Sequence, residues 1–149
     1  MDGGADIQVK IGIRGEYIVF RENNMQNNNK ITSFTQLIAW QKAHQLVLHV
    51  YKFTHTFPQE ERYGLSDQMR RCCVSVSSNI AEGFSRQSKK EKIQFYYTSR
   101  GSLTELQNQL LIARDVHYIQ EEIFNHIAPE TVEVHKLING MIKSMKVRR

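Results

Sequence analysis

The sequence has few residues that interrupt helices, since only two of its 149 residues are proline, Pro58 and Pro129. Long helices are therefore possible over most of the chain. The sequence also has no run of about 18 apolar residues, so we expect no transmembrane helix. Its first residues, which include Asp2 and Asp6, lack the charged-then-apolar order of a signal peptide. We therefore expect a cytoplasmic protein.

Cysteine is also scarce, because only Cys72 and Cys73 are present and they are adjacent. Neighbouring side chains on a helix point about 100° apart, so a disulfide between them would be strained. The pair is better interpreted as two small buried apolar residues in a reducing compartment.

The composition is typical of one globular domain, with 40% hydrophobic and 23% charged residues. The formal net charge is +5 and the isoelectric point is about 9.3. The whole excess lies from Phe34 onward, where 16 Lys and Arg face 11 Asp and Glu. A charge of this size permits nucleic-acid binding but does not require it.

Residues 1–33 differ from the rest of the chain. Apolar residues alternate at Ile7, Val9, Ile11 and Ile13. A turn at residues 14–15 followed by the apolar residues 17–20 would complete a weak hairpin. An Asn-rich stretch then resembles a linker and contains Met25, at which the natural product is hypothesised to begin. We expect 1–33 to be an extension or linker, disordered or a weak hairpin, and 34–149 to form the folded domain.

Four amphipathic helices are predicted from apolar residues that recur every three or four positions, at 35–57, 66–84, 88–117 and 120–145. Ser66 is a suitable N-cap for the second helix, and Ser88 with Glu91 forms a capping box for the third. Pro129 either bends the fourth helix or begins a new one. Short connections between the helices predict an all-α, antiparallel up-and-down four-helix bundle.

The third predicted helix has a thin waist at Ser99, Gly101 and Ser102. A glycine inside a helix costs about 1 kcal/mol relative to alanine. We expect close helix packing at Gly101 to compensate for this cost.

Several strings in the predicted helices carry a family resemblance. The most specific are Ser-Asn-Ile-Ala-Glu-Gly at 78–83 and Arg-Gly-Ser-Leu at 100–103, supported by Ala-Trp-Gln-Lys-Ala at 39–43 and Tyr-Gly-Leu at 63–65. From about Phe34 to its C-terminus the chain resembles the four-helix-bundle protein family first noticed in intervening sequences of bacterial large-subunit ribosomal RNA genes. It departs from that family in having Cys72-Cys73 where an alanine pair is usual, and in having Pro129 in its fourth helix.

The resemblance implies a bundle that assembles into a homopentameric ring or barrel. The chain is also similar to the accessory protein of diversity-generating retroelements, which shares the bundle, partners a reverse transcriptase and binds nucleic acid. For most members of the family no biochemical activity is established, so the resemblance implies a fold more directly than a function.

Basic residues concentrate between residues 66 and 100, where seven positive charges face three negative ones. The candidate nucleic-acid-binding residues are Arg70, Arg71, Arg86, Lys89, Lys90, Lys92 and Arg100. The start of the third helix adds its dipole to the attraction for phosphate. The basic tail at 143–149 is a second candidate, and an ordinary solvated surface is the alternative interpretation of both.

Five polar residues are also predicted to form a network between the second and third helices: Arg71, Asn79, Glu82, Arg86 and Arg100. Glu82 and Arg86 are i, i+4 neighbours, and Arg100 could reach Glu82 across the interface. Such a network would fix the register of the helices or of a subunit contact. The alternative is an anion site that uses arginine as a bidentate donor.

Signals for catalysis and metal binding are weak. The six histidines include no i, i+4 pair, so we predict no metal site. No base lies within a turn of Ser75, Ser77 or Ser78, and neither a phosphate-binding glycine loop nor a paired catalytic carboxylate is visible. We therefore expect no enzyme, no catalytic residue and no cofactor.

Two functional hypotheses remain. In the first, the protein is a non-catalytic homo-oligomeric module that binds RNA or DNA through basic surface, as an accessory to a nucleic-acid enzyme. In the second, it is a protein-interaction scaffold with no nucleic-acid role, and its basic residues serve subunit contacts. The dependence of any nucleic-acid binding on salt separates the two.

Overall fold

The computed structural model describes residues 8–13, 16–21 and 30–147 and divides the chain into two units, 1–32 and 33–149. In the first unit, strand β1 (Gln8–Ile13) pairs antiparallel with β2 (Glu16–Arg21), with Val9 opposite Phe20. These strands coincide with the segments whose alternation predicted a hairpin. Ile7, the turn residues 14–15, Met25 with its Asn-rich stretch, and the last two residues lie outside the described parts.

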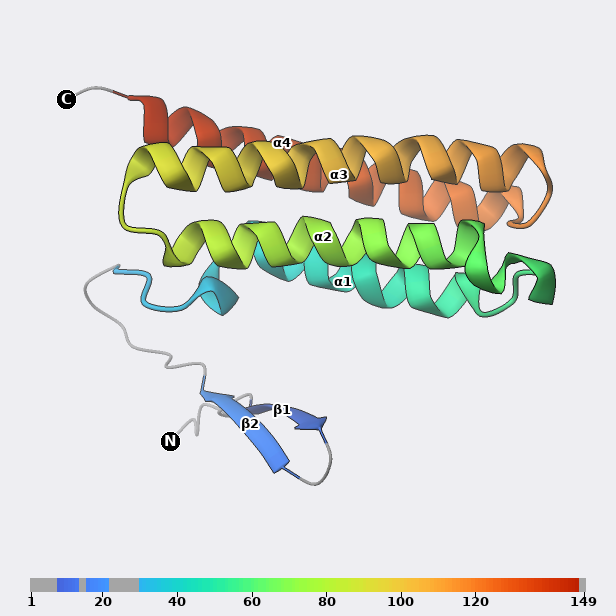
Figure 1. Cartoon of the computed structure of the whole chain (residues 1–149), viewed down its shortest axis with the longest axis horizontal. Coiled ribbons are helices and arrows are strands. Elements are labelled where there is room, and N and C mark those ends of the chain that lie inside the picture. The colour runs from blue at the N-terminus through green and yellow to red at the C-terminus, as the bar shows by residue number, and fades with distance from the viewer. Residues whose placement is uncertain (1–7, 14–15, 22–29, 148–149) are drawn as a thin grey trace, which may run out of the picture. The chain divides into compact units, whose positions relative to one another are not determined.

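The second unit is a four-helix bundle (Figure 1). Its helices are α1 (Ile38–Thr54), α2 (Leu65–Ser85), α3 (Lys89–Asp115) and α4 (Glu121–Lys146), with short 3-10 helices η1 (Phe34–Gln36) and η2 (Gln59–Tyr63). Consecutive helices run antiparallel and pack side by side, and α1 also packs on α4. The predicted up-and-down bundle is confirmed.

The core is built from apolar side chains that repeat at helical spacing, as an amphipathic bundle helix requires. Fully buried examples, one or two from each helix, are Leu46, Val50, Met69, Ile80, Leu103, Leu106 and Ile138. Cys72 and Cys73 belong to this core as free thiols, and burial raises the pKa of each to about 12. The interpretation of the cysteines as buried apolar residues is confirmed.

The start of α2 differs from the prediction. Ser66 is not its N-cap: Gly64 holds that position, and Ser66 is buried within the first turn. Instead, the Leu65 N–H donates to Oε2 of Glu61 at 2.8 Å. The short helix η2 brings Glu61 to the start of α2, so a residue from the preceding element satisfies a backbone donor that an N-cap side chain would otherwise bind.

Pro129 lies inside α4, which continues on both sides of it, so no new helix begins there. Proline has no N–H, and its ring opposes the carbonyl four residues earlier. Pro129 is exposed on the surface, where water can bind the carbonyl of Asn125 that loses its helical partner. The helix is therefore maintained across the proline by packing of its buried face on α1 and α3.

Helices α2 and α3 approach closely through small residues. Ser99 Oγ donates to the carbonyl of Val76 at 2.7 Å, and a Cβ added to Gly83 would lie 2.6 Å from Cε1 of Tyr96. Gly101, in contrast, is exposed, and a Cβ added there would meet nothing within 4 Å. The expected close packing at Gly101 is therefore wrong within this chain, and Gly83 is the glycine that lets the helices approach.

None of the helices in the described part of the chain is both long and apolar enough to cross a membrane.

Candidate nucleic-acid interface

The antiparallel topology brings the end of α2, the start of α3 and the end of α4 to one end of the bundle (Figure 1). Basic residues that are far apart in sequence therefore lie at the same end. We define the basic end by Arg86, Lys89, Lys90, Lys92, Arg100, Lys143 and Lys146. It combines residues 86–100 of the first predicted patch with part of the basic tail.

A capping box fixes the turn from α2 into α3. Ser88 Oγ accepts from the Glu91 N–H at 3.2 Å, and the Glu91 carboxylate accepts from the Ser88 N–H and hydroxyl. These hydrogen bonds from Ser88 hold the pKa of Glu91 below its usual value. The predicted cap is confirmed, and it places the positive end of the α3 dipole at the basic end.

Two of the predicted phosphate ligands are held by contacts within the bundle. Lys92 Nζ donates to the carbonyl of Phe84 at 2.6 Å and lies 5.4 Å from the centre of its ring. The guanidinium of Arg86 lies 4.6 Å from the centre of the Phe95 ring. Lys92 therefore satisfies a carbonyl at the C-terminus of α2, where a cation is favoured.

Tyr97 joins α3 to the end of α4. The guanidinium of Arg100 and the ammonium of Lys146 lie 4.9 and 5.1 Å from the centre of its ring. Arg100 also donates from Nη1 to Oδ1 of Asn139 at 3.0 Å. The two cations are therefore ordered beside each other although 46 residues separate them in sequence.

Besides Lys146, which lies over the Tyr97 ring, three lysines of the basic end are exposed: Lys89, Lys90 and Lys143. Within the described residues, nothing pairs with or hydrogen-bonds to their ammonium groups. Lys89 and Lys90 occupy the first turn of α3, whose leading N–H groups have no acceptor within the helix. A phosphate at this turn could therefore meet both side-chain and backbone donors.

Charge is strongly divided along the bundle. Residues 34–46, 75–101 and 134–147 form the half with the basic end, and they hold nine Lys and Arg against only Glu82 and Glu91. Residues 47–74 and 102–133 form the opposite half, with five Lys and Arg against nine acidic residues. The net charge of the chain is modest because the positive charge of one half of the bundle is partly cancelled by the negative charge of the other.

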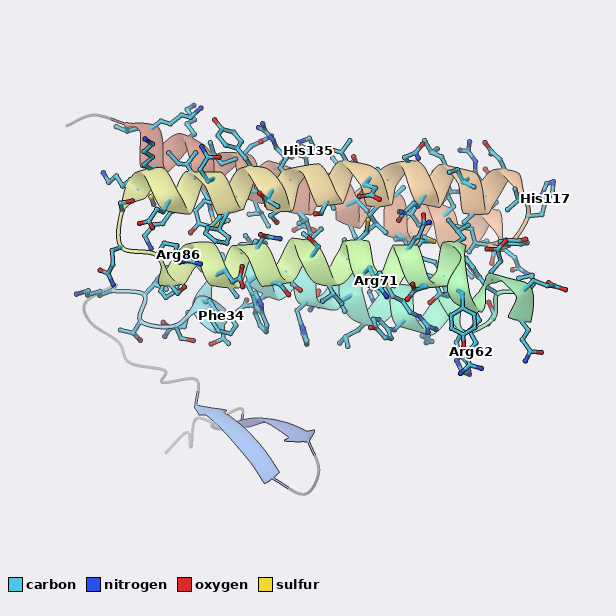
Figure 2. The ribbon with its side chains drawn as sticks, viewed as in Figure 1. Phe34, Arg62, Arg71, Arg86, His117 and His135 are labelled. Atoms are coloured by element: carbon cyan, nitrogen blue, oxygen red, sulfur yellow. The ribbon has the colours of Figure 1, made fainter. Side chains whose placement is uncertain are left out.

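The seven predicted nucleic-acid-binding residues do not form one surface, which corrects the sequence interpretation. Arg70 and Arg71 precede Arg86 by about four helical turns, or about 22 Å, and Figure 2 shows Arg71 nearer to Arg62 than to Arg86. Arg70 donates to Thr54 Oγ1 at 2.9 Å, while Arg71 Nε pairs with Asp67 at 2.9 Å. Both therefore belong to the opposite half.

The predicted polar network is not formed either. Arg86, the C-cap of α2, is directed to α3, where its guanidinium lies on the Phe95 ring and not beside the Glu82 carboxylate. Among the described residues, no ion pair includes Glu82. Asn79 donates to Ser75 on its own helix. Arg100 is turned toward α4 as described above, and Arg71 pairs locally.

One cluster was missed by the sequence reasoning, which compared histidines only with one another along single helices. His49 of α1 lies beside His126 and Glu130 of α4, and their ligand atoms are all within 4.8 Å of one another. The i, i+4 spacing of His126 and Glu130 was the available signal. The third member could be found only from the packing of α1 on α4.

Comparison with known proteins identifies the family. The sequence profile of the family described as 23S rRNA-intervening sequence protein matches residues 35–140, which span α1, α2, α3 and most of α4. The chain belongs to the 23S rRNA-intervening sequence protein family. The resemblance stated from the sequence is thus confirmed, and the match ends before Lys143 and Lys146 of the basic end.

One protein of known structure has the same fold as this chain. It is a protein with unknown function from the S23 ribosomal protein family of Bacteroides thetaiotaomicron, with 20% sequence identity and a TM-score of 0.66. The match covers 71% of this chain and 96% of that one. At this identity the comparison supports the bundle alone. No curated protein matches the chain.

Proposed function

We propose that this member of the 23S rRNA-intervening sequence protein family is a non-catalytic, homo-oligomeric module that binds RNA or DNA through its basic end. The observation that carries the proposal is the division of charge, with nine basic and two acidic residues in one half of the bundle. A concentrated positive field attracts the phosphate backbone over distances of about 10 Å at 0.1 M salt.

The chemistry of the basic end suits phosphate. Lys89, Lys90 and Lys143 supply exposed point charges, and Arg86 and Arg100 are ordered on aromatic rings. An ordered guanidinium group can donate two hydrogen bonds to a phosphate, and it loses little side-chain conformational entropy on binding. Lysine ammonium and arginine guanidinium groups at neutral pH act as donors without making or breaking bonds. The module therefore holds nucleic acid, and a partner enzyme performs any chemistry on it.

Self-assembly would multiply these contacts. The bundle exposes apolar side chains that a subunit interface could cover, including Ile38, Leu48 and Tyr51 of α1 and Leu111 and Ile112 of α3. Repeated basic ends in a ring, such as the homopentamer implied by the family resemblance, would bind one nucleic acid at several points. Each added point raises the overall affinity through a high effective concentration.

The test is a salt-titrated binding assay with structured RNA and with single-stranded DNA. For single strands the slope of log affinity against log salt is about −0.7 per neutralised phosphate. Replacing Lys89, Lys90 and Lys143 with alanine removes three exposed charges, so we expect weaker binding and a slope shallower by about 2. Lys92 is left in place because it caps α2.

The matched control variant replaces three basic residues of the opposite half: Lys52→Ala, Arg62→Ala and Arg71→Ala. It changes the net charge equally, so it should leave the affinity and the slope nearly unchanged if the basic end is the site. Equal losses in both triple variants would show that only net charge matters. No binding at low salt by the full chain would remove the proposal and favour the protein-interaction scaffold.

A further inference from the structure

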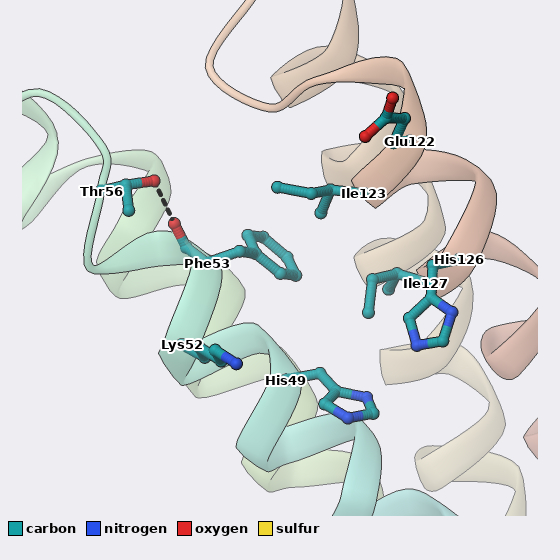
Figure 3. Close-up of a pocket in the computed structure, with 8 residues that line it drawn as sticks. All are labelled: His49, Lys52, Phe53, Thr56, Glu122, Ile123, His126 and Ile127. Carbon is teal, nitrogen blue, oxygen red and sulfur yellow. Dashed lines mark hydrogen bonds between the residues drawn. The ribbon is translucent and has the colours of Figure 1, made fainter.

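A compact group of potential metal ligands lies between α1 and α4, in the half of the bundle opposite to the basic end. His49 Nδ1 is 2.8 Å from Oε2 of Glu130, and His126 Nε2 is 3.5 Å from Oε1 of the same carboxylate. All three ligand atoms fall within 4.8 Å of one another. Figure 3 shows both imidazole rings at the same edge of a cavity between the two helices.

We propose that His49, His126 and Glu130 bind a divalent transition-metal ion, for which Zn²⁺ is the appropriate probe. Two imidazoles and one carboxylate are the protein ligands of many open zinc sites. Bonds of about 2.0–2.2 Å in a tetrahedron place ligand atoms about 3.3 Å apart. The observed 2.8 and 3.5 Å bracket this value.

The ligands can adjust to an ion without disturbing the core. Their side chains are partly open to solvent, with exposed fractions of 38% for His49, 71% for His126 and 25% for Glu130. Small side-chain rotations can therefore bring the three ligand atoms together. The backbone positions are supplied by two rigid helices, which is the usual way a bundle builds a metal site from facing side chains.

The surroundings favour a cation with an open coordination position. The adjoining cavity has a volume of about 420 Å³, and Phe53, Ile123 and Ile127 are among its lining residues. Glu122, one turn before His126, also lines the cavity and adds a negative charge to it. This half of the bundle carries the excess of acidic residues, which raises the local concentration of cations.

Without a metal, the same residues form a polar contact in which Glu130 accepts a hydrogen bond from the His49 imidazole and lies 3.5 Å from Nε2 of His126. This arrangement also satisfies the polar groups between the helices. The two interpretations differ in their response to Glu130→Gln. An amide can still accept and donate hydrogen bonds, but it is a poor ligand for a transition metal, so the substitution separates metal binding from hydrogen bonding.

The experiment is calorimetric titration of the metal-free full chain, without a histidine tag, by Zn²⁺, together with the visible absorption of bound Co²⁺. We expect a single ion per chain, a tetrahedral Co²⁺ spectrum and a melting temperature that rises with Zn²⁺ concentration. His49→Ala, His126→Ala and Glu130→Gln should each weaken Zn²⁺ binding by about 100-fold. His135→Ala, in the same helix as His126 but outside the cluster, should bind as the unsubstituted chain does.

Circular dichroism of each variant verifies the fold before titration. Absence of Zn²⁺ binding by the folded unsubstituted chain would overturn the proposal, as would binding that the three cluster variants leave unchanged. Equal weakening by His135→Ala would show scattered surface binding and would also overturn it. None of these results depends on nucleic-acid binding, so this proposal and the proposed function can fail separately.

Discussion

Replacing Gly83 and Gly101 by alanine in separate variants tests whether the close approach of α2 and α3 depends on one glycine and not the other. Both residues lie in long helices, and alanine is favoured over glycine in helix interiors by about 1 kcal/mol. Their surroundings differ completely, because Gly83 is buried against α3 while Gly101 is exposed. We expect the two substitutions to change stability in opposite directions.

The magnitudes follow from the space around each Cβ. At Gly83 the new methyl group would lie 2.6 Å from Cε1 of Tyr96 and 3.0 Å from Cβ of Phe95. Overpacking of this kind costs about 1–3 kcal/mol, and the Tyr96 ring is itself buried. Gly83 is also in the last turn of α2, where the gain in helix propensity is small, so we expect a net loss of about 2 kcal/mol. At Gly101 nothing opposes the gain of about 1 kcal/mol.

Thermal and urea unfolding followed by circular dichroism measure both effects. For a domain of this size 1 kcal/mol corresponds to about 4 °C. Gly101→Ala should therefore melt about 4 °C higher than the unsubstituted chain, and Gly83→Ala about 8 °C lower. The three proteins must be compared at one concentration because assembly stabilises the folded state. A stabilising Gly83→Ala would refute the packing argument, and an oligomer disrupted by Gly101→Ala would place that residue in a subunit contact.

Two other predictions concern single features of the bundle. Burial raises the pKa of both Cys72 and Cys73 from the usual 9.0 to about 12, so the folded chain keeps protons that the unfolded chain releases. This stabilisation is complete below about pH 9 and is lost as the pH rises toward 12. Urea unfolding across that range should show a falling free energy of unfolding, and the variant with both Cys72→Ala and Cys73→Ala should show a smaller fall. Pro129→Ala restores a helical donor at an exposed position, so it should raise the free energy of unfolding by about 2–3 kcal/mol in the same urea experiment. An unchanged free energy of unfolding would show that Pro129 does not destabilise α4.

Much of the fold was predictable because local signals agreed with one another. The apolar spacing, the Ser88 capping box and the scarcity of proline all indicate long amphipathic helices with short connections. The prediction for Ser66 was wrong because Glu61, from a separate short helix, took the backbone donor at the start of α2. The prediction for Gly101 was wrong because it rested on residue type alone: Gly101 lies two residues before the buried Leu103, about 200° around the helix and so away from the core.

The candidate sites were predictable only in part. Residues 86–92 were identified from their charge, but Arg70 and Arg71 were wrongly grouped with them because distance along a helix was ignored. The predicted network failed because Arg86 lies on the Phe95 ring of α3 and Arg100 donates to Asn139 of α4, so neither arginine pairs with Glu82. Lys143 and Lys146 join the basic end only because α4 runs antiparallel to α3.

The sequence alone determined that this chain forms four amphipathic helices and that its cysteines are buried, since both depend on the local pattern of apolar residues. The tertiary structure decided which charges share an end and which histidine reaches Glu130. These outcomes depend on the packing of one helix on another, and residues such as His49 and Glu130 become neighbours only when α1 and α4 bury their apolar faces together.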